Sequence, residues 1–479
     1  MNEGHRGAWR CTRLLLCGVA AFAATIGAAA AADAQSAEPA AVAASAASTP
    51  EPSKSYAIPA YEIVGFDALV NIANRVFGHS DDYKVTLDTI RHNLQSGWVA
   101  DNDPFKVNQL AHPYQGSMYH GFARSTGHGY WESAGYTFAG SALWEIAGER
   151  TPPSRNDQIA SGIAGSFLGE PLFRMANLML ERGRMSPRWR EISAAAIQPS
   201  LGFNRLVYGD RFGGIFPSND PAYYGRLMLG ASGLTKNQPG TSTTTKRGEI
   251  LADFSMDYGL PGKPGYVYRR PFDYFSFQAI GSSANVIENV MTRGLLVGRD
   301  YEVGPNYRGV WGLYGSYDYL APQFYHLSST ALAVGTTGQW WMSKSNALQG
   351  TAMAGIGYAA ASTLKRSDAG DRDYHYGLAP QAMLALRWIY GERASLDVTA
   401  REYYVSRVAG AGNGFDNIVR TDASFTWRLR NQHGVAIKYL FNRRDASYPG
   451  QDRRTQARGS IGIYYVLLGQ DRFGAVDWR

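Results

Sequence analysis

The stretch that decides the fold is residues 434–442, which read Gly-Val-Ala-Ile-Lys-Tyr-Leu-Phe-Asn. Every second side chain from Val435 to Phe441 is large and apolar, and the residues between them include Lys438 and Asn442. Because side chains of a strand point to alternate faces, this stretch has one apolar face and one more polar face. A soluble β-sandwich buries its apolar faces, whereas a membrane β-barrel turns them toward lipid around a polar lumen.

The same alternation recurs along the chain after about residue 220. It is clear in residues 395–401 and 420–429, and about twelve segments show it, give or take two. Toward the C-terminus, long connections such as 363–374 alternate with tight turns such as 431–432. Such alternation is expected when one end of a barrel is extracellular and the other periplasmic. We therefore predict an antiparallel membrane β-barrel of about twelve strands over residues 216–469, with a soluble periplasmic β-sandwich as the weaker alternative.

The last predicted strand carries Gly459, Ile461, Ile463 and Tyr465 on one face. This pattern resembles the glycine-hydrophobic-aromatic signal that barrel-assembly machinery reads, so we expect that machinery to be a partner. In most such barrels the aromatic residue ends the chain. Here a C-terminal tail of residues 470–479 follows, which is a departure from the pattern.

The N-terminus predicts export. Arg6, Arg10 and Arg13 precede an apolar stretch that ends in the small residues of Ala32-Asp33-Ala34, so residues 1–34 read as a secretory signal peptide. A lipoprotein signal at Cys17 is the less favoured alternative. Because both cysteines of the chain precede residue 35, the expected mature protein has no disulfides. We predict the outer membrane of a Gram-negative bacterium as its location.

Composition excludes several classes of protein. Residues 35–55 are rich in Ala, Ser, Pro and Glu and read as a disordered linker. The formal net charge of +7 is mild and lacks a basic run interleaved with aromatic residues, so we expect anionic lipid and lipopolysaccharide rather than nucleic acid as partners. Beyond the signal, no stretch of 18 residues is free of charge, which argues against membrane-spanning helices.

Residues 56–215 follow a helical period instead. Apolar residues between Tyr61 and Phe77 have roughly the spacing of one helical face. A second helix is predicted to begin after Ser154, which would cap it, with Asp157 favouring the helix dipole, and to run to about Glu181. We expect an all-α domain that either plugs the barrel lumen or lies at its periplasmic mouth.

Polar and aromatic motifs are densest between Trp98 and Glu149. In order, they are Trp98, Asn102-Asp103-x-Phe105, Asn108-Gln109, His112-Pro113-Tyr114-Gln115-Gly116, Ala123-Arg124-Ser125, Trp131-Glu132-Ser133 and Trp144-Glu145. Together with Ser154-x-Asn156-Asp157, Gly169-Glu170 and Gly202-Phe203-Asn204-Arg205, they resemble the bacterial family called domain of unknown function 3943 over roughly residues 85–210. One departure is Ala100-Asp101-Asn102-Asp103, where the family often has two acids after the first Trp. The family name implies no activity.

Candidate catalytic residues follow from the side chains themselves. His112 precedes Pro113, which suits a first helical turn, so its imidazole either caps or bridges helices or serves as a general base. Glu132 and Glu145 are candidate acids, and Ser125 or Ser133 a candidate nucleophile. His112, His120 and His128 recur every eight residues, which places them on different faces of a helix, so we predict no metal site and no cofactor.

Candidate binding residues are the charged and aromatic groups with apolar neighbours, because a charge in such a setting is paired or has a shifted pKa. They are Arg124, Trp131, Asp157, Glu170 and Arg174. Glu170 and Arg174 are four residues apart and are expected to form an ion pair. Arg124 paired with Glu132 or Glu145 would hold helices together, and the sequence does not separate this structural role from a binding site.

The predicted lumen carries charges of both signs. They are Asp253, Asp257, Asp397, Arg401, Arg420, Asp422, Arg428 and Lys438. Such charges can line a water channel or fill a closed barrel with salt bridges, and twelve strands lie between small filled barrels and open porins. We expect an envelope transport or structural protein with a helical plug or docking domain, of unknown substrate and oligomeric state. The alternative is an outer-membrane enzyme that acts on lipid or lipopolysaccharide through a His, Glu and Arg site in the helical domain.

Overall fold

The computed structural model describes residues 53–78, 80–101, 103–183, 185–238, 247–362, 372–406, 414–448 and 453–478. The expected signal peptide and most of the expected linker lie outside these residues. The chain divides into two compact units. Unit 1 comprises residues 1–97, 116–153 and 172–218, and unit 2 comprises residues 98–115, 154–171 and 219–479. The barrel and two helical segments therefore belong to one unit.

Helices occupy most of the described chain before residue 209. The α-helices are α2 Ala57–Ala73, α3 Leu87–Gln95, α4 His112–Ser125, α5 Tyr130–Ala147, α6 Arg155–Ile159, α7 Gly165–Arg182, α8 Pro187–Ile197 and α9 Pro199–Tyr208. Two π-helical turns, η3 Val107–Ala111 and η4 Ala160–Ala164, lead directly into α4 and α7. Ser154 caps α6 by accepting from the Asp157 backbone N–H (3.2 Å), as its sequence predicts. Across the described residues, every helix is too short or too polar to span a bilayer.

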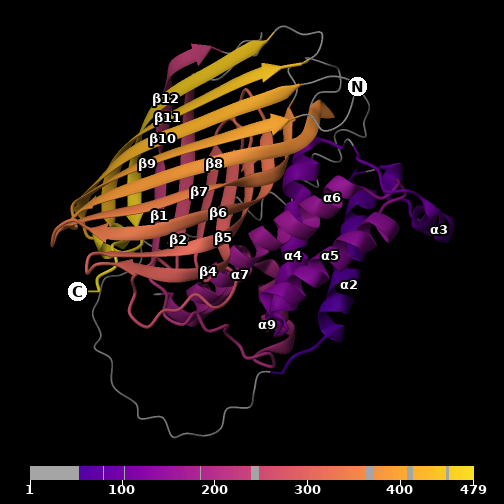
Figure 1. Ribbon diagram of the computed structural model, residues 1–479. Coiled ribbons are helices and arrows are strands. Elements are labelled where there is room, and N and C mark those ends of the chain that lie inside the picture. The colour runs from indigo at the N-terminus through magenta and orange to yellow at the C-terminus, as the bar shows by residue number, and fades with distance from the viewer. Residues whose placement is uncertain are drawn as a thin grey trace, which may run out of the picture. The chain divides into compact units, whose positions relative to one another are not determined.

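Twelve antiparallel strands form a closed barrel (Figure 1). They are β1 Tyr223–Gln238, β2 Gly248–Tyr258, β3 Phe275–Ser282, β4 Asn289–Val303, β5 Tyr307–Leu320, β6 Leu327–Trp341, β7 Asn346–Ser362, β8 Tyr374–Tyr390, β9 Ala394–Ser406, β10 Phe415–Arg430, β11 His433–Ser447 and β12 Arg454–Leu468. Each strand pairs with its neighbours in sequence, and β1 closes the barrel against β12. The predicted fold class and strand number are confirmed.

The strand registers fix which side chains face the lumen. Arg226 on β1 meets Asp397 on β9 at 2.8 Å, and Lys438 on β11 meets Asp253 on β2 at the same distance. Because these pairs join strands that are not neighbours, their side chains point inward. On each of these strands, the residues that alternate with the inward-facing ones point outward.

The outward-facing side chains form an apolar band around the barrel. Its exposed members include Leu229, Ile250, Trp311, Leu313, Leu332, Val334, Trp340, Ile356, Leu384, Leu386, Trp388, Leu396, Val398, Phe425, Trp427, Val435, Ile437, Ile461, Ile463 and Tyr465. Aromatic members such as Trp340, Trp388, Trp427 and Tyr465 gather toward the end of the barrel that has the tight turns. An apolar exterior with an aromatic girdle around a charged interior is the architecture of outer-membrane β-barrels.

Candidate functional sites in the lumen and on the outer wall

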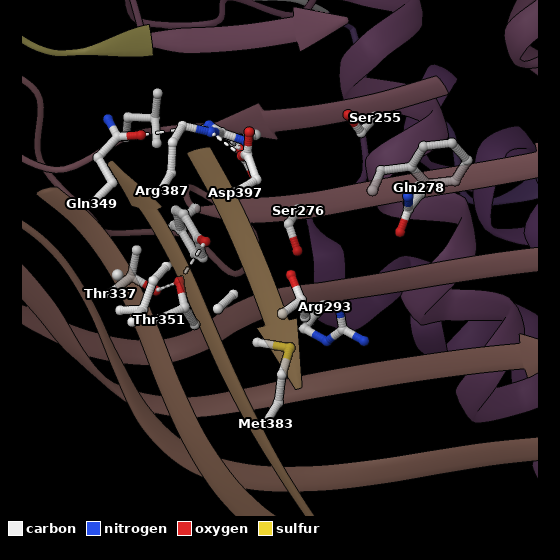
Figure 2. A pocket seen from close by; sticks show the side chains of 18 of the residues that line it. Ser255, Ser276, Gln278, Arg293, Thr337, Gln349, Thr351, Met383, Arg387 and Asp397 are labelled. Atoms are coloured by element: carbon white, nitrogen blue, oxygen red, sulfur yellow. Dashed lines mark hydrogen bonds and ion pairs between the residues drawn. The ribbon is translucent and has the colours of Figure 1, made fainter. Parts of the chain in front are cut away.

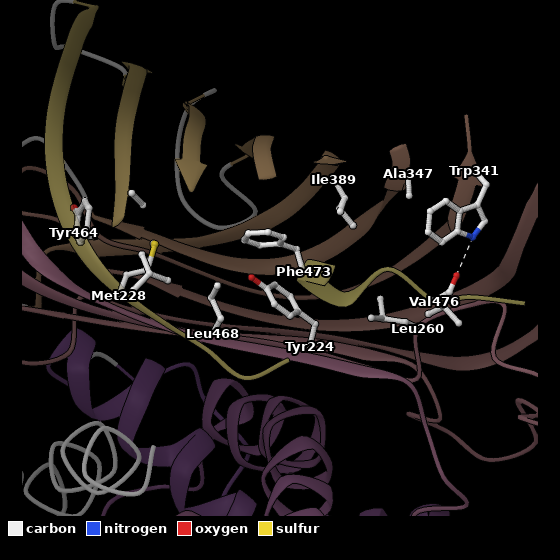
Figure 3. Close-up of a cluster of buried hydrophobic side chains, with 12 residues drawn as sticks. Tyr224, Met228, Leu260, Trp341, Ala347, Ile389, Tyr464, Leu468, Phe473 and Val476 are labelled. Carbon is white, nitrogen blue, oxygen red and sulfur yellow. Dashed lines mark hydrogen bonds between the residues drawn. The ribbon is translucent and has the colours of Figure 1, made fainter. Parts of the chain in front are cut away.

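The C-terminal tail occupies one end of the lumen. After β12 the chain reverses through Arg472, Phe473 and Gly474, which all have positive φ, and it enters the barrel. Phe473 is fully buried there among Tyr224, Met228, Ile389 and other lumen residues (Figure 3). Positive φ is unfavourable for the two residues other than glycine, so burial of the Phe473 ring and the bonds of the following residues must hold this turn.

Side-chain amides bind the backbone of this tail. Val476 accepts hydrogen bonds from Gln339 Nε2 (2.6 Å) and Trp341 Nε1 (2.9 Å), and its N–H donates to Gln339 Oε1 (2.9 Å). Gln349 Nε2 donates to the carbonyl of Gly474 (2.8 Å). These bonds take the place of strand pairing, and they satisfy backbone groups that the lumen would otherwise leave buried and unpaired.

A second apolar cluster lies at the opposite end. The connection between β5 and β6 turns Tyr325 inward, where its hydroxyl donates to Asn442 Oδ1 (3.0 Å). Tyr325 packs in one buried cluster with Leu320, Leu327 and Val405, among others. Buried apolar side chains therefore lie at both ends of the lumen.

Ion pairs fill the middle of the lumen. Asp397 lies between Arg226 and Arg387, at 2.8 and 2.6 Å, and Arg387 also contacts Asp257 (3.0 Å). Arg293 pairs with Asp318 (2.7 Å). A cavity of about 120 Å³ remains between these groups, and Figure 2 shows the Arg387–Asp397 pair and Arg293 in its wall. That volume has room for several water molecules.

The predicted lumen charges all lie on the inward-facing side. Asp253, Asp257, Asp397 and Lys438 form the ion pairs given above. Arg420 Nη1 donates to Asn442 Oδ1 (3.0 Å), and Arg428 stacks on the Phe473 ring of the tail at 5.1 Å. Arg401 and Asp422 approach only to 4.0 Å. Of the two readings left open by the sequence, this geometry fits a filled barrel.

The second candidate site lies on the outside of the same wall. Asp318 on β5 faces the lumen, where Tyr403 of β9 donates to it (3.0 Å), so its neighbours Tyr317 and Tyr319 face outward. Arg387 on β8 also faces the lumen, and the unbroken β7–β8 register places Tyr374 and Tyr376 on the outer face. These four tyrosines lie near the end of the barrel that has the longer connections.

Two helical segments of unit 2, residues 98–115 and 154–171, bind these outward-facing tyrosines. Tyr317 donates to the Gln109 carbonyl (2.5 Å), and Asn108 Nδ2 donates to the Tyr374 hydroxyl (2.9 Å). The fully buried Phe105 ring packs against Tyr319 and Tyr374, with ring centres 5.9 and 5.3 Å apart. These contacts lie outside the barrel, so these two segments do not plug the lumen. The tail fills part of it instead.

One carboxylate and three amides connect the segments to each other and to the wall. Asp101 Oδ1 accepts from Asn108 Nδ2 (2.6 Å) and from Asn156 Nδ2 (2.7 Å). Asn156 Nδ2 also lies 2.8 Å from the Tyr376 hydroxyl, which Gln109 Nε2 reaches at 3.0 Å. The Asn156 Oδ1 atom accepts the backbone N–H of Asp101 (3.0 Å). We call Asp101, Asn108, Gln109, Asn156 and Tyr376 the outer-wall cluster.

His112 lies beside this cluster. It directly follows the π-turn η3 and contacts the other π-turn, η4. Its Nδ1 is 3.2 Å from Ser161 Oγ in η4, and its Nε2 is 3.8 Å from Asp157 Oδ2. Burial lowers the pKa of His112 to about 4, although the nearby Asp101 carboxylate acts in the opposite direction. The imidazole is therefore neutral at neutral pH. π-turns often occur at functional sites.

The remaining catalytic candidates lie in unit 1. Ser125 Oγ donates to the Gly121 carbonyl (2.6 Å) and accepts from Asn204 Nδ2 (2.8 Å), an arrangement that ties two helices together. Glu132 is 42% exposed and pairs with Lys54 (2.5 Å), which is the largest reason that its pKa falls to about 2. Glu145 is buried, and Ser133 is fully buried in α5.

The binding candidates are distributed over both units. In unit 1, Arg124 stacks on the Phe173 and Phe216 rings at 4.6 and 4.5 Å, and Trp131 is 61% exposed. Arg174 lies 5.7 Å from the Phe216 ring. In unit 2, Glu170 is fully buried on α7, and Asp157 accepts from Asn156 Nδ2 at 3.1 Å. The structure thus brings His112 and Asp157 together in unit 2. The other catalytic candidates, Ser125, Glu132 and Glu145, belong to unit 1.

Sequence reasoning missed several residues of these sites. One is Ser161, whose hydroxyl contacts His112. The others are Tyr374 and Tyr376, whose hydroxyls accept hydrogen bonds from the side-chain amides of Asn108 and Asn156. A partial signal existed for the tyrosines, since polar hydroxyls at lipid-facing positions of a strand call for partners. The described residues contain no group of three or more His, Cys, Asp or Glu side chains arranged to hold a metal ion.

No curated protein matches the chain. Solved structures resemble its barrel, and a family model matches part of its helical region. The NanC porin is 10% identical with a TM-score of 0.27, over 50% of this chain and 98% of that one. The outer-membrane channel DcaP of Acinetobacter baumannii is 8% identical with a TM-score of 0.23, over 51% and 96%. At these scores the likenesses carry no argument about function. Residues 97–200 match the family model described as Domain of unknown function (DUF3943), in agreement with the resemblance of the motifs.

Proposed function

We propose that the protein is a closed outer-membrane barrel with an envelope-structural role, which anchors its family segments on the outer wall. The observation that carries this proposal is the filled lumen. Apolar clusters around Phe473 and Tyr325 occupy its two ends, and ion pairs such as Arg226–Asp397 bridge the space between them. Buried ion pairs of this kind hold the strands of the wall in one arrangement. They also occupy the space through which a solute would have to pass.

The proposed partners follow from the outer surface. The exposed apolar band requires a lipid environment, with lipopolysaccharide as the expected neighbour at the end with longer connections. On β12, Ile461, Ile463 and Tyr465 are exposed on one face, where barrel-assembly machinery would read them. The anchored segments bind the wall through the outer-wall cluster, whose amides gain hydroxyl partners that lipid could not supply.

Conductance in planar bilayers tests the proposal. We expect the full-length protein to insert without producing current steps. A variant that ends at Gly469 removes the closure around Phe473 and should also stay closed, because the Tyr325 cluster remains. Heat-modifiable gel migration verifies that both barrels are folded. Current steps only in the truncated variant would show a channel gated by its tail, and steps in the full-length protein would contradict the closed barrel.

A second candidate function is an enzyme acting on lipid or lipopolysaccharide. The contact of neutral His112 with Ser161 Oγ, 3.2 Å apart on the outer wall, favours it. A neutral imidazole can accept a serine proton, although both side chains are buried. The test is mass spectrometry of lipid A and phospholipids from cells with wild type, His112→Ala or Ser161→Ala. Loss of one modified lipid in both variants, with folded barrels, would support catalysis. Unchanged lipids would remove this candidate.

A further inference from the structure

Several helices of unit 1 bury polar side chains and expose apolar ones. On α2, Asp67 is buried and accepts a hydrogen bond from the Tyr119 hydroxyl, and Glu62 accepts one from Asn204 Nδ2 of α9 (3.3 Å). The buried polar residues of α5 are Ser133, Thr137, Ser141 and Glu145. In a water-soluble helical domain, side chains of this kind face the solvent and apolar ones face inward.

The outer face of α2 is apolar along its whole length. Its exposed residues are Ala57, Ala60, Tyr61, Val64, Gly65, Ala68, Leu69 and Ile72. Because they recur at intervals of three and four residues, they form one stripe along the helix. The nearest exposed charges are Lys54, before the helix begins, and Arg75, after it ends.

The two helices that contact α2 expose apolar residues as well. Tyr136 of α5 donates to the Tyr56 carbonyl (2.6 Å) near one end of α2, and Asn71 of α2 donates to the Gly148 carbonyl (2.8 Å) near the other, so α2 and α5 run parallel (Figure 1). The Asn204–Glu62 contact connects α9 to α2. The exposed large apolar residues of α5 and α9 are Trp131, Phe138, Phe203, Leu206 and Val207. We call the exposed apolar residues of α2, α5 and α9 the helical apolar faces.

An occupant has to cover these faces, because soluble proteins rarely leave extended apolar surface in water. The rest of the chain favours lipid as that occupant. The apolar band of the barrel already requires a bilayer. The helices α4 and α7 both begin in the segments of unit 2 that bind the outward-facing side of the wall, and both continue into unit 1.

The ends of the α2–α5 pair also fit a lipid surface. Tyr56, Tyr61 and Trp131 are exposed at its N-terminal end, beside the ion pair of Lys54 and Glu132 (2.5 Å). Tyrosine and tryptophan next to charged groups are typical of the boundary between acyl chains and headgroups.

We propose that the helical apolar faces contact the acyl chains of the outer membrane, so that unit 1 is a lipid-contacting domain and not a water-exposed one. Contact with acyl chains does not require either helix to cross the bilayer. The polar side chains that these helices bury are then kept away from lipid by the helices themselves. The proposal needs the outer-membrane location but not the filled lumen, so a conducting barrel would leave it intact.

Fluorescence quenching at single cysteines tests the proposal. Cys11 and Cys17 are replaced by serine, and Leu69→Cys is labelled with a thiol-reactive, environment-sensitive fluorophore. The full-length protein is reconstituted into phosphatidylcholine vesicles that contain a lipid with a nitroxide on its acyl chain. We expect this lipid to quench the label at Leu69→Cys by the same fraction as a label at Ile437→Cys, in the exposed apolar band of the barrel. Iodide on both sides of the membrane should quench it little.

Lys344→Cys is the water-exposed control, because Lys344 lies in the exposed tight turn between β6 and β7. Iodide should quench its label strongly, and heat-modifiable migration verifies that every variant is folded. Iodide quenching at Leu69→Cys equal to that at Lys344→Cys would place the face in water and overturn the proposal. Protection from both quenchers would overturn it as well, because protein would then cover the face. In that case a disulfide-linked dimer of unlabelled Leu69→Cys would identify a second copy of the chain as the cover.

Discussion

The two faces of the barrel wall both bury polar groups, but they satisfy them by different means. In the lumen, charges meet charges across the barrel, as in the Arg226–Asp397–Arg387 contact. On the outer wall, amides meet tyrosine hydroxyls and the carboxylates of Asp101 and Asp157. The difference teaches that a wall facing lipid can bind a helical segment with mostly neutral groups, whereas the lumen holds full charges, most of which lie close to an opposite charge.

The largest effect is expected from removing a lumen carboxylate. Asp397→Ala leaves Arg226 without its carboxylate and leaves Arg387 with Asp257 alone. Breaking a buried pair of this kind costs about 3–5 kcal/mol. Urea unfolding of the barrel in lipid vesicles measures the loss. Asp300→Ala on the exposed part of β4 is the control and should change little, and equal effects of the two variants would show that the lumen pairs do not matter.

The next effect concerns pH and the outer wall. Since burial lowers the pKa of His112 from 6.5 to about 4, the unfolded chain binds more protons than the folded chain between these values. His112 therefore contributes stability that is present above pH 6.5 and is lost as the pH falls toward 4, by up to about 3 kcal/mol. The measurement is the difference in unfolding free energy between wild type and His112→Gln across this range. A difference independent of pH would contradict a neutral buried imidazole.

A smaller loss is expected when the central amide of the outer-wall cluster is removed. Asn156→Ala leaves Asp101 and Tyr376 each without one donor, which should cost about 2 kcal/mol. Limited proteolysis of residues 98–115 should quicken, because this segment loses a contact to the other segment. Protection equal to that of wild type would show that the cluster does not hold the segments.

The smallest effect should come from Tyr376→Phe, which keeps the ring and removes the hydroxyl. The ring stacks on Tyr358 at 5.2 Å and would remain packed, whereas the hydroxyl contacts, including those to Asn156 and Gln109, are lost. We expect about 1–2 kcal/mol in the same unfolding measurement. Tyr390→Phe, at an exposed position of the same strand, is the matched control and should be neutral. An effect no larger than that of the control would assign the docking to ring packing alone.

The sequence predicted the strands of the barrel wall well. It did not predict which segments of the chain contact the two faces of that wall, for physical reasons. Period-two alternation, as in residues 434–442, depends only on which side meets lipid, so about twelve strands, give or take two, could be predicted. Tyr374 and Tyr376 occupy the same outward positions as lipid-facing side chains, so alternation could not show that helical segments cover them. The tail has no periodicity, and its entry into the lumen depends on long-range bonds to Gln339 and Trp341. Ser161 was missed because its partner His112 lies 49 residues away.

Thiol cross-linking at neighbouring positions of β8 tests the central claim most directly. Asn108→Cys is combined either with Tyr374→Cys, on the outer face, or with His375→Cys, which points into the lumen toward Asp416 (3.6 Å). Both cysteines of the chain, Cys11 and Cys17, lie in the expected signal peptide and are replaced by serine. With a short bifunctional reagent, the structure predicts efficient cross-linking of the pair containing Tyr374→Cys and little of the other pair. The reverse result would place this family segment inside the lumen and contradict the account.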